Sequence, residues 1–144
     1  KNVCIGADVI VGFPGETEDE FNRTLKFIKQ LPITYLHVFP YSERENTAAI
    51  NFENKIEKRT IKARRNQLIN LSNKLKTSFY YKYLNTQHAA LFEQENKKGM
   101  LYGFTENYIK VKIPFKKELA GTKQQILLMD IEADGIVNSK IKLN

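Results

Sequence analysis

Glycine and proline follow an apolar run near the start of the chain, and this stretch is the one best suited to chemistry. The run Asp8–Val11 leads directly into Gly12-Phe13-Pro14-Gly15, and an acidic amphipathic segment begins at Thr17. An apolar run, a tight turn and then a helix are typical of a buried parallel strand in an α/β protein. The loops after such strands hold the chemistry of many α/β proteins. Taken alone, a short glycine motif more often makes only a structural turn.

Few other side chains point to catalysis, and no catalytic residue is assigned. Asp8 lies within the apolar run, where it either hydrogen-bonds locally or lines a site. We expect Glu16 to serve the positive end of the following helix. His37 has no second histidine or cysteine beside it, so we expect a packed core histidine rather than a metal ligand. Cys4 is the one cysteine, which excludes an intrachain disulfide and a cluster held by this chain's thiolates alone.

The elements around the Gly-Pro-Gly turn predict a right-handed βαβ unit. We expect a strand over residues 9–13 and a second strand over residues 35–39. The helix between them has Thr17 as its N-cap with Glu20 three residues later, a capping box. Two parallel strands cannot cover their own faces and edges. We therefore expect exposed apolar strand faces, self-association of the chain, and completion of the sheet by another part of a longer polypeptide.

Positive charge is concentrated in the middle of the 144-residue chain. Its net charge of +7 comes from 23 Lys and Arg against 16 Asp and Glu, and residues 51–82 alone carry that excess. Apolar residues at helical spacing and the absence of glycine and proline predict one long amphipathic helix over residues 54–84. We expect its basic side chains to lie in water and contact RNA phosphates, although most charged runs are simply solvated. The basic residues are Lys58, Arg59, Lys62, Arg64 and Arg65.

Residues 85–144 have a different periodicity. Short apolar runs over residues 89–93, 100–104, 108–113, 126–131 and 136–143 are separated by glycine, proline and Asp-Gly. Five short strands in this spacing predict a small OB-like barrel, an architecture that commonly binds oligonucleotides. Lys110 and Lys112 share one face of a strand and suit a phosphate track. We expect Phe104 in the barrel core, whereas Tyr102 and Tyr108 fit either the core or base stacking.

Three stretches together resemble the radical S-adenosylmethionine methylthiotransferases, which insert sulfur into a C–H bond and methylate it. They are residues 6–17, residues 36–44 and residues 47–49. The His-Val-Phe-Pro-Tyr-Ser stretch most resembles the branch that acts on threonylcarbamoyl-adenosine beside the tRNA anticodon. Residues 85–144 resemble the TRAM domain of these enzymes. Asn46 stands where the family has glycine, and we expect Asn46 to adopt the positive φ that this loop needs.

The resemblance implies a fold and a set of binding residues. Residues 1–53 match the last βαβ portion of an incomplete (β/α) barrel, residues 54–84 a basic connecting helix, and residues 85–144 a TRAM-like RNA-binding β-barrel. For S-adenosyl-L-methionine, it implies contacts from Asp8, Ile10, Val11, Gly12, Phe13, Gly15, Val38 and Phe39. For RNA, Ser42 and Arg44 follow from the resemblance, and Lys58, Arg59, Arg64, Arg65, Tyr108, Lys110 and Lys112 from charge and aromatic character.

The resemblance also implies components outside this chain. The cysteines of the two [4Fe-4S] clusters lie upstream in the family, so we expect the chain alone to be inactive and to bind no cofactor. Its expected partners are the tRNA anticodon stem-loop and the missing N-terminal domains, in the cytoplasm and away from any membrane. A pure RNA-binding module and a methylthiotransferase acting on a ribosomal protein remain as alternatives.

Overall fold

The computed structural model describes residues 3–142, which contain two compact units. One unit comprises Ile5–Leu75, and the remaining described residues form the other. The long helix α2 (Lys58–Tyr81) contributes its first part to one unit and its last turns to the other. Each unit is described by itself below.

The first unit is the expected βαβ arrangement. Strand β1 (Gly6–Val11), helix α1 (Glu18–Gln30) and strand β2 (Tyr35–Pro40) follow one another, and a short 3₁₀ helix η1 (Ala48–Asn51) comes next. The two strands are parallel, in a register that pairs Gly6 with Tyr35 and Val11 with Pro40. Strand β1 begins three residues earlier than the apolar run suggests and ends before the Gly-Pro-Gly turn.

Helix α1 begins with the expected capping box. The Thr17 hydroxyl accepts the Glu20 N–H at 3.2 Å, and the Glu20 carboxylate accepts the Thr17 N–H at 2.8 Å. These two bonds satisfy backbone donors that the first helical turn leaves without partners. The bonds to Thr17 also lower the pKa of the exposed Glu20 carboxyl group.

Helix α2 is shorter than the sequence suggests at both ends, because residues 54–57 and 82–84 are not helical. Its apolar stripe is confirmed within the first unit, where Leu68 and Leu71 are buried. Together with residues of β1, α1 and β2 they form one core, made of Val11, Phe21, Ile28, Leu36, Leu68 and Leu71.

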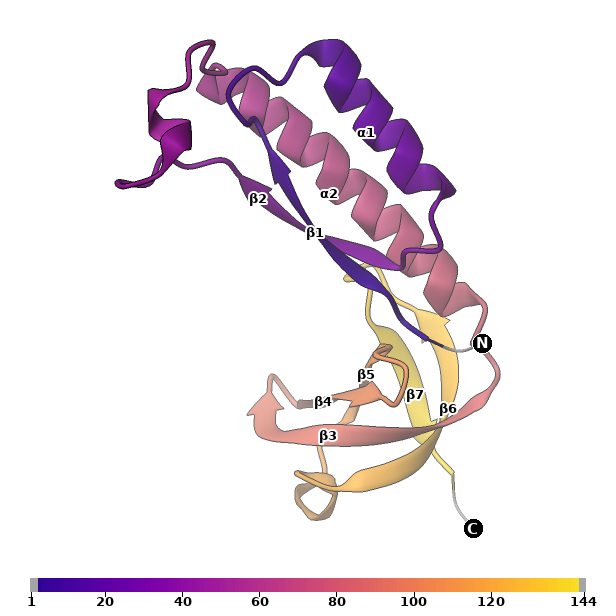
Figure 1. Ribbon diagram of the computed structural model, residues 1–144. Helices are drawn as coiled ribbons and strands as arrows, with labels where there is room; N and C mark the ends of the chain where they lie inside the picture. Colours follow the sequence, from indigo (N-terminus) through magenta and orange to yellow (C-terminus); the bar gives the residue numbers. More distant parts are fainter. Residues whose placement is uncertain (1–2, 143–144) are drawn as a thin grey trace. The chain divides into compact units, whose positions relative to one another are not determined.

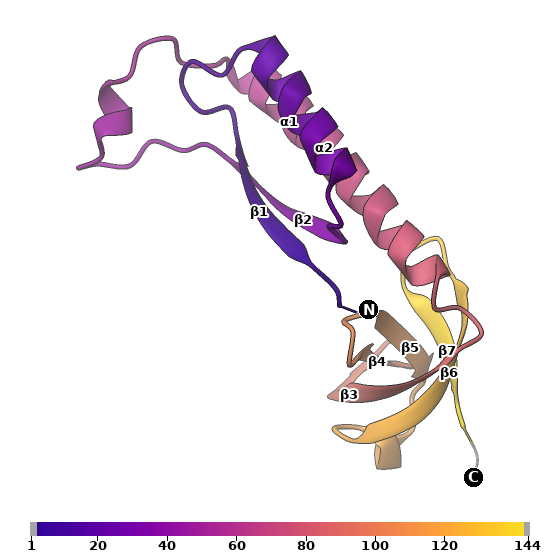
Figure 2. The ribbon, with the colours of Figure 1, turned by 45° about the vertical axis from the view of Figure 1, so that its right-hand side comes forward.

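Both helices cover the same face of the strand pair, as the two views show (Figures 1 and 2). The other face is open: Ile10 is 61% exposed and Phe39, its partner in the register, is 50% exposed. The expectation of uncovered apolar strand faces is therefore confirmed. The expectation of a packed His37 is wrong, because His37 lies on this open face with its ring edge against Tyr35.

The second unit is a five-stranded mixed sheet that closes on itself. Its strands lie close to the five expected runs, although the last run ends beyond the described residues. They are β3 (Gln87–Lys97), β4 (Met100–Thr105), β5 (Lys110–Pro114), β6 (Lys123–Ile131) and β7 (Val137–Ile141). A short 3₁₀ helix η2 (Lys117–Leu119) precedes β6. The closed order is β3-β4-β5-β7-β6, in which only the β5–β7 pairing is parallel.

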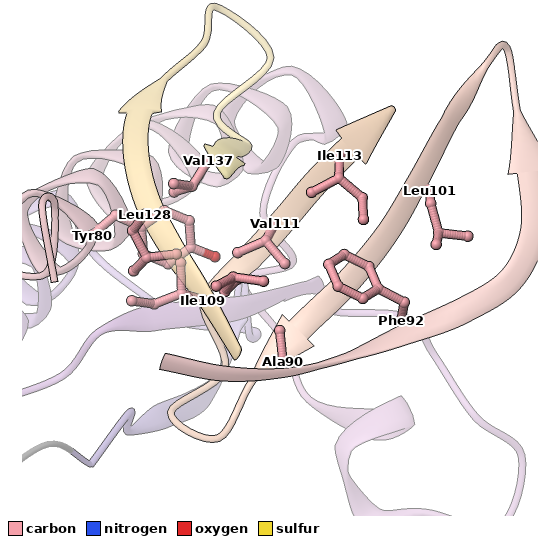
Figure 3. Packing of buried hydrophobic residues seen from close by; sticks show 10 residues of the cluster. Tyr80, Ala90, Phe92, Leu101, Ile109, Val111, Ile113, Leu128 and Val137 are labelled. Atoms are coloured by element: carbon pink, nitrogen blue, oxygen red, sulfur yellow. The ribbon is translucent and has the colours of Figure 1, made fainter. Parts of the chain in front are cut away.

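Alternate residues of these strands fill the interior of the ring (Figure 3). Phe92, Leu101, Ile109, Val111 and Leu128 are each at most 2% exposed. Tyr80, from the last turn of α2, joins this core, and its hydroxyl accepts the Lys110 N–H at 3.1 Å. Among residues 3–142, no helix has both the length and the apolar character needed to cross a bilayer.

Candidate functional site

An open pocket of about 520 Å³ lies on the uncovered face of the strand pair. Its floor contains Asp8 and Ile10 of β1 and Phe39 of β2, and Phe13 forms one wall. The loop after β2 supplies the rest of the lining: Tyr41, Ser42, Arg44, Thr47 and Ala49, with Pro40 at the strand end. The volume lies within the range of small-molecule sites, about 300–1,000 Å³.

The Gly-Pro-Gly turn is held in a conformation that requires glycine. Gly12 and Gly15 have φ angles of +80° and +87°, in the left-handed region that other residues rarely adopt. A Cβ atom on Gly12 would lie 2.4 Å from Cγ1 of Ile61 on α2, whereas nothing lies near the corresponding position on Gly15. The helix therefore packs directly against the backbone of the turn at Gly12.

Phe13 is the side chain that the turn presents to the pocket. Its ring packs edge-on against Tyr41 at 5.2 Å and against Phe52 at 5.8 Å between ring centroids. Phe13 is still 42% exposed, so these contacts position the ring without covering it. This aromatic wall beside the exposed Ile10 and Phe39 gives a surface on which a flat ring could pack.

The loop after β2 is shaped by its own hydrogen bonds. The Tyr41 N–H donates to the Val11 carbonyl at 2.8 Å, which continues the strand pairing into the loop. The Thr47 hydroxyl donates to the Arg44 carbonyl at 2.8 Å. Asn46 has a φ of 63°, so the expected positive φ at this position is confirmed.

One buried polar atom borders this region without a partner. The hydroxyl of Tyr41 is buried and makes no hydrogen bond with any described residue. Tyr41 lines the open pocket and also a neighbouring pocket of about 450 Å³ that contains Gly12 and Lys58. A buried hydroxyl without a partner costs free energy, which a polar ligand atom or water would offset.

Six of the residues expected to contact a cofactor or RNA meet in the open pocket. They are Asp8, Ile10, Phe13, Phe39, Ser42 and Arg44. Val11 and Val38 instead face the helices and pack in the core of the first unit. Gly15 lies outside the pocket lining, where its N–H donates to the Asn54 carbonyl at 3.0 Å.

Arg64 does not lie in water with the other basic residues of α2, so that expectation is wrong. Its side chain is 6% exposed, and its guanidinium group donates to the Glu16 carboxylate at 2.8 Å and to the Glu18 carboxylate at 3.0 Å. The expected role of Glu16 was also incomplete, since its carboxylate binds Arg64 and the Gly12 N–H as well. Lys58, Arg59, Lys62 and Arg65 are exposed, as the charge pattern predicts.

The closed sheet carries aromatic and basic side chains on its outer surface. Lys110 lies over the rings of Tyr102 and Phe104, with its Nζ 5.7 Å and 5.9 Å from their centroids. Phe104 is 40% exposed and packs near Tyr108, which is 67% exposed, so the expectation of a core position for Phe104 is wrong. Side chains alternate along β4, and the buried positions there are Leu101, Gly103 and Thr105.

Lys112 shares the outer face of β5 but is not available to phosphates. Its ammonium group donates to Glu132 at 2.5 Å and to Asp134 at 2.8 Å, and the residue is 6% exposed. Burial lowers the pKa of Lys112, but the bonds to Asp134 and Glu132 outweigh it and raise the pKa overall. The bond from Lys112 lowers the pKa of both Glu132 and Asp134. Of the two lysines expected to contact phosphates, only Lys110 is therefore available to do so.

Comparison with known proteins identifies the relatives of this chain. The threonylcarbamoyladenosine tRNA methylthiotransferase MtaB of Bacillus subtilis (strain 168) is 37% identical over 123 residues, which are 83% of this chain and 27% of that protein. The protein of the same name from Aquifex aeolicus (strain VF5) is 42% identical over 115 residues, 80% of this chain and 27% of that protein. The chain is homologous to part of the tRNA methylthiotransferases.

The similarity extends to a second group of tRNA-modifying enzymes. The tRNA-2-methylthio-N(6)-dimethylallyladenosine synthase of Desulfitobacterium hafniense (strain Y51) is 34% identical over 130 residues, 89% of this chain and 29% of that protein. The chain thus spans under a third of the length of the tRNA methylthiotransferases that it matches. No protein-family model matches it.

Sequence reasoning missed several residues that shape the two candidate sites. Tyr41, Thr47 and Ala49 line the pocket and lie in the stretches that carry the resemblance, but none was assigned as a site residue. No local pattern predicted the 3₁₀ helix η1 that contains Ala49. Arg64 and Lys112 looked like surface charges because their acidic partners lie 48 and 20 residues away in the sequence. No group of three or more His, Cys, Asp or Glu residues in the described part of the chain is arranged to hold a metal ion.

Proposed function

We propose that this chain is the C-terminal part of a radical S-adenosylmethionine tRNA methylthiotransferase, in which it forms one wall of the cofactor site and contacts tRNA. The observation that carries the proposal is the 37–42% identity to two tRNA methylthiotransferases over 80–83% of the chain. The pocket supports it, because Asp8, Ile10, Phe13 and Phe39, half of the residues for which the resemblance implies cofactor contacts, line its open face.

The pocket residues suit S-adenosylmethionine. Ile10, Phe13 and Phe39 offer an apolar surface to the adenine ring, and Asp8, Ser42 and Arg44 offer polar groups to the rest of the molecule. The buried Tyr41 hydroxyl is an unpaired polar group beside the same pocket. When bound, this cofactor supplies the radical and the methyl group that methylthiolation needs. The residues of this chain orient it and exclude water from one side.

This chain's residues do not suit the iron–sulfur clusters that such chemistry uses. A [4Fe-4S] cluster is commonly held by cysteine thiolates, and the chain contains one cysteine. In our proposal, another part of the polypeptide supplies both clusters and completes the open sheet.

The RNA-binding part of the proposal rests on two surfaces. One is the exposed basic face of α2, formed by Lys58, Arg59, Lys62 and Arg65. The other is the aromatic and basic patch of the closed sheet, formed by Tyr102, Phe104, Tyr108 and Lys110. The strand order, 1-2-3-5-4 when the five strands are numbered in sequence, supports an OB-like barrel of the TRAM type. Exposed aromatic rings beside a lysine suit unpaired bases and their phosphates.

We assign the substrate to adenosine beside the tRNA anticodon, with threonylcarbamoyl-adenosine as the specific nucleoside. The His37–Arg44 stretch supports this branch, and two of its members show 37% and 42% identity. The 34% identity to a dimethylallyladenosine synthase makes that nucleoside the competing substrate. A methylthiotransferase acting on a ribosomal protein is less well supported, since His37–Arg44 differs from the loop usual in those enzymes.

A second candidate function is a pure RNA-binding module in which the first unit only supports packing. The patch around Lys110, with its exposed aromatic rings, favours this alternative. The two functions differ in what the pocket does. Cofactor binding requires the pocket residues, whereas RNA binding by a pure module does not.

Titration of the chain with S-adenosylhomocysteine, the unreactive cofactor analogue, tests the cofactor site. We expect weak binding that Ile10→Asp reduces at least tenfold, because a carboxylate would replace apolar surface on the pocket floor. Phe27→Asp is the matched control, since Phe27 on α1 is 60% exposed, as Ile10 is 61% exposed, but does not line the pocket. Absence of binding, or equal loss in both variants, would favour the pure RNA-binding module.

Binding of an anticodon stem-loop transcript tests the RNA surface. We expect Arg65→Ala to weaken binding and to reduce the slope of log K against log salt by about 0.7–0.9, the value for one lost phosphate contact. Arg23→Ala removes another exposed arginine, from helix α1, and serves as the control. An unchanged affinity and slope for Arg65→Ala would exclude this helix face as a contact surface.

A further inference from the structure

We propose that Arg64 is a positioning residue for the candidate cofactor pocket, which acts by holding Glu16 against the backbone of the Gly12–Gly15 turn. The inference depends on the proposed function in one respect: it assumes that the pocket binds a cofactor. Arg64 lies outside the pocket lining and belongs to helix α2, while the turn that it holds joins β1 to α1.

The guanidinium group of Arg64 is anchored by three hydrogen bonds. Its Nη1 atom donates to the Glu16 carbonyl at 2.9 Å and to the Glu16 carboxylate at 2.8 Å, and Nη2 donates to the Glu18 carboxylate at 3.0 Å. The Arg64 side chain is 6% exposed, and that of Glu16 is 16% exposed. Such a poorly solvated pair loses much of its stabilisation when one partner is removed, because the other charge is left uncompensated.

The Glu16 carboxylate transmits this anchoring to the turn. The Oε2 atom that binds Arg64 also accepts the Gly12 N–H at 2.9 Å. The Glu16 N–H in turn donates to the Phe13 carbonyl at 3.0 Å. Arg64 thus fixes the residue that closes the turn at both Gly12 and Phe13.

Neighbouring contacts of α2 reinforce the same geometry. Ile61, one helical turn before Arg64, contacts Gly12 so closely that a Cβ atom would not fit. The Arg64 guanidinium carbon lies 5.3 Å above the ring of the buried Phe21, within the range of cation–π attraction. A planar guanidinium group can bind Glu16 through Nη1 and Glu18 through Nη2 at the same time. A lysine ammonium group has a single nitrogen and cannot reproduce this geometry.

The consequence for the pocket concerns Phe13. Its backbone belongs to the turn that Arg64 holds, and its ring forms a pocket wall against Tyr41. If Glu16 loses its partner, the Gly12–Phe13 peptide gains freedom, and the ring no longer has one fixed place. Ligand affinity would then fall because the wall must be ordered on binding.

Amide hydrogen exchange of Gly12, measured by NMR on the full chain, tests the positioning directly. We expect Arg64→Met to accelerate Gly12 exchange at least tenfold relative to Leu36. The Leu36 N–H donates to the buried Ser72 hydroxyl in the same unit, so it reports whether that unit remains folded. Arg64→Lys keeps the charge and should restore part of the Gly12 protection, and the exposed Arg23→Met should change neither amide.

A double-mutant cycle with Glu16→Gln separates positioning from general packing. The glutamine oxygen can still accept the Gly12 N–H but no longer attracts Arg64 as a charge. We therefore expect Arg64→Met to accelerate Gly12 exchange much less in the Glu16→Gln background than in the natural sequence. Equal effects in both backgrounds would overturn the inference, as would Gly12 and Leu36 accelerating together or an unchanged Gly12.

Affinity for S-adenosylhomocysteine provides the second measurement. We expect Arg64→Met to weaken binding about tenfold and Arg64→Lys to weaken it less. If the natural chain does not bind this analogue, the proposed cofactor function fails while Gly12 exchange still decides the role of Arg64. If the natural chain binds and Arg64→Met binds equally well, the inference fails while the cofactor function stands.

Discussion

At the scale of single residues, Gly12 and Gly15 have similar backbone angles but different surroundings. Both have a positive φ, yet only Gly12 faces a side chain, Ile61, where a Cβ atom would be. We expect Gly12→Ala to destabilise the first unit by about 2–4 kcal/mol, the sum of backbone strain and overpacking. Gly15→Ala should cost about 1 kcal/mol from backbone strain alone.

Urea unfolding of the two alanine variants, followed by a signal from the first unit, checks this difference. Ile61→Ala in the Gly12→Ala background should recover part of the loss, since it removes the crowding atoms. Equal destabilisation at the two glycines would show that α2 does not press on the turn.

The sequence identified these glycines because a positive φ depends on local backbone chemistry. The positive φ of Asn46 was instead implied by the resemblance, because the family has glycine at this position, and the observed φ of 63° confirms it. The sequence prediction was wrong about Arg64 and Lys112, since the environment of a basic side chain depends on acids that approach it only after folding. The expected core positions of His37 and Phe104 were wrong because alternation along a strand separates its two faces but does not show which face another element covers.

At the scale of elements, the link between β5 and the β6–β7 connection depends on pH. Lys112 of β5 binds Glu132 and Asp134, and its bonds lower the pKa of both carboxyl groups. A carboxyl group with a lowered folded-state pKa adds stability above its unfolded pKa and loses it as pH falls through the folded value. We therefore expect the barrel to lose stability below about pH 4.

Chemical unfolding of Lys112→Met across the acidic range measures this contribution. The variant should be less stable than the natural chain near neutral pH, and the difference should shrink below about pH 4 as the carboxyl groups become protonated. Lys140→Met, at an exposed position on β7, should follow the natural pH profile. A constant difference between Lys112→Met and the natural chain would contradict an electrostatic link.

Elements with a strong local signal were predicted well. The Thr17 capping box and the positions of all five barrel strands follow from short-range chemistry and alternation. The ends of α2 were not predictable, because residues 54–57 and 82–84 lack the glycine or proline that usually marks a helix end. The 3₁₀ helix η1 depends on tertiary context and had no sequence signal.

At the scale of the whole molecule, the hydrophobic residues form two separate cores. One consists of buried residues from Val11 to Leu71, and the other of buried residues from Tyr80 to Val137. We expect Leu101→Ala, at a fully buried barrel position, to cost about 2–5 kcal/mol in the barrel. Hydrogen exchange should quicken at Val111 and stay unchanged at Leu36, whereas equal acceleration at both would show one cooperative unit.

The open face of the strand pair should make this chain self-associate. Ile10, Phe13 and Phe39 are 61%, 42% and 50% exposed on one face, and β1 and β2 pair only with each other among the described residues. Apolar patches next to open strand edges promote association in water.

We expect sedimentation velocity to show dimers or larger species at about 100 μM. Ile10→Lys with Phe39→Lys should weaken association at least tenfold, whereas Phe27→Lys, which changes a similarly exposed residue on α1, should not. A monomer at every concentration would mean that the face is too small or too polar to need a partner, which would also weaken the proposal that a longer polypeptide covers it.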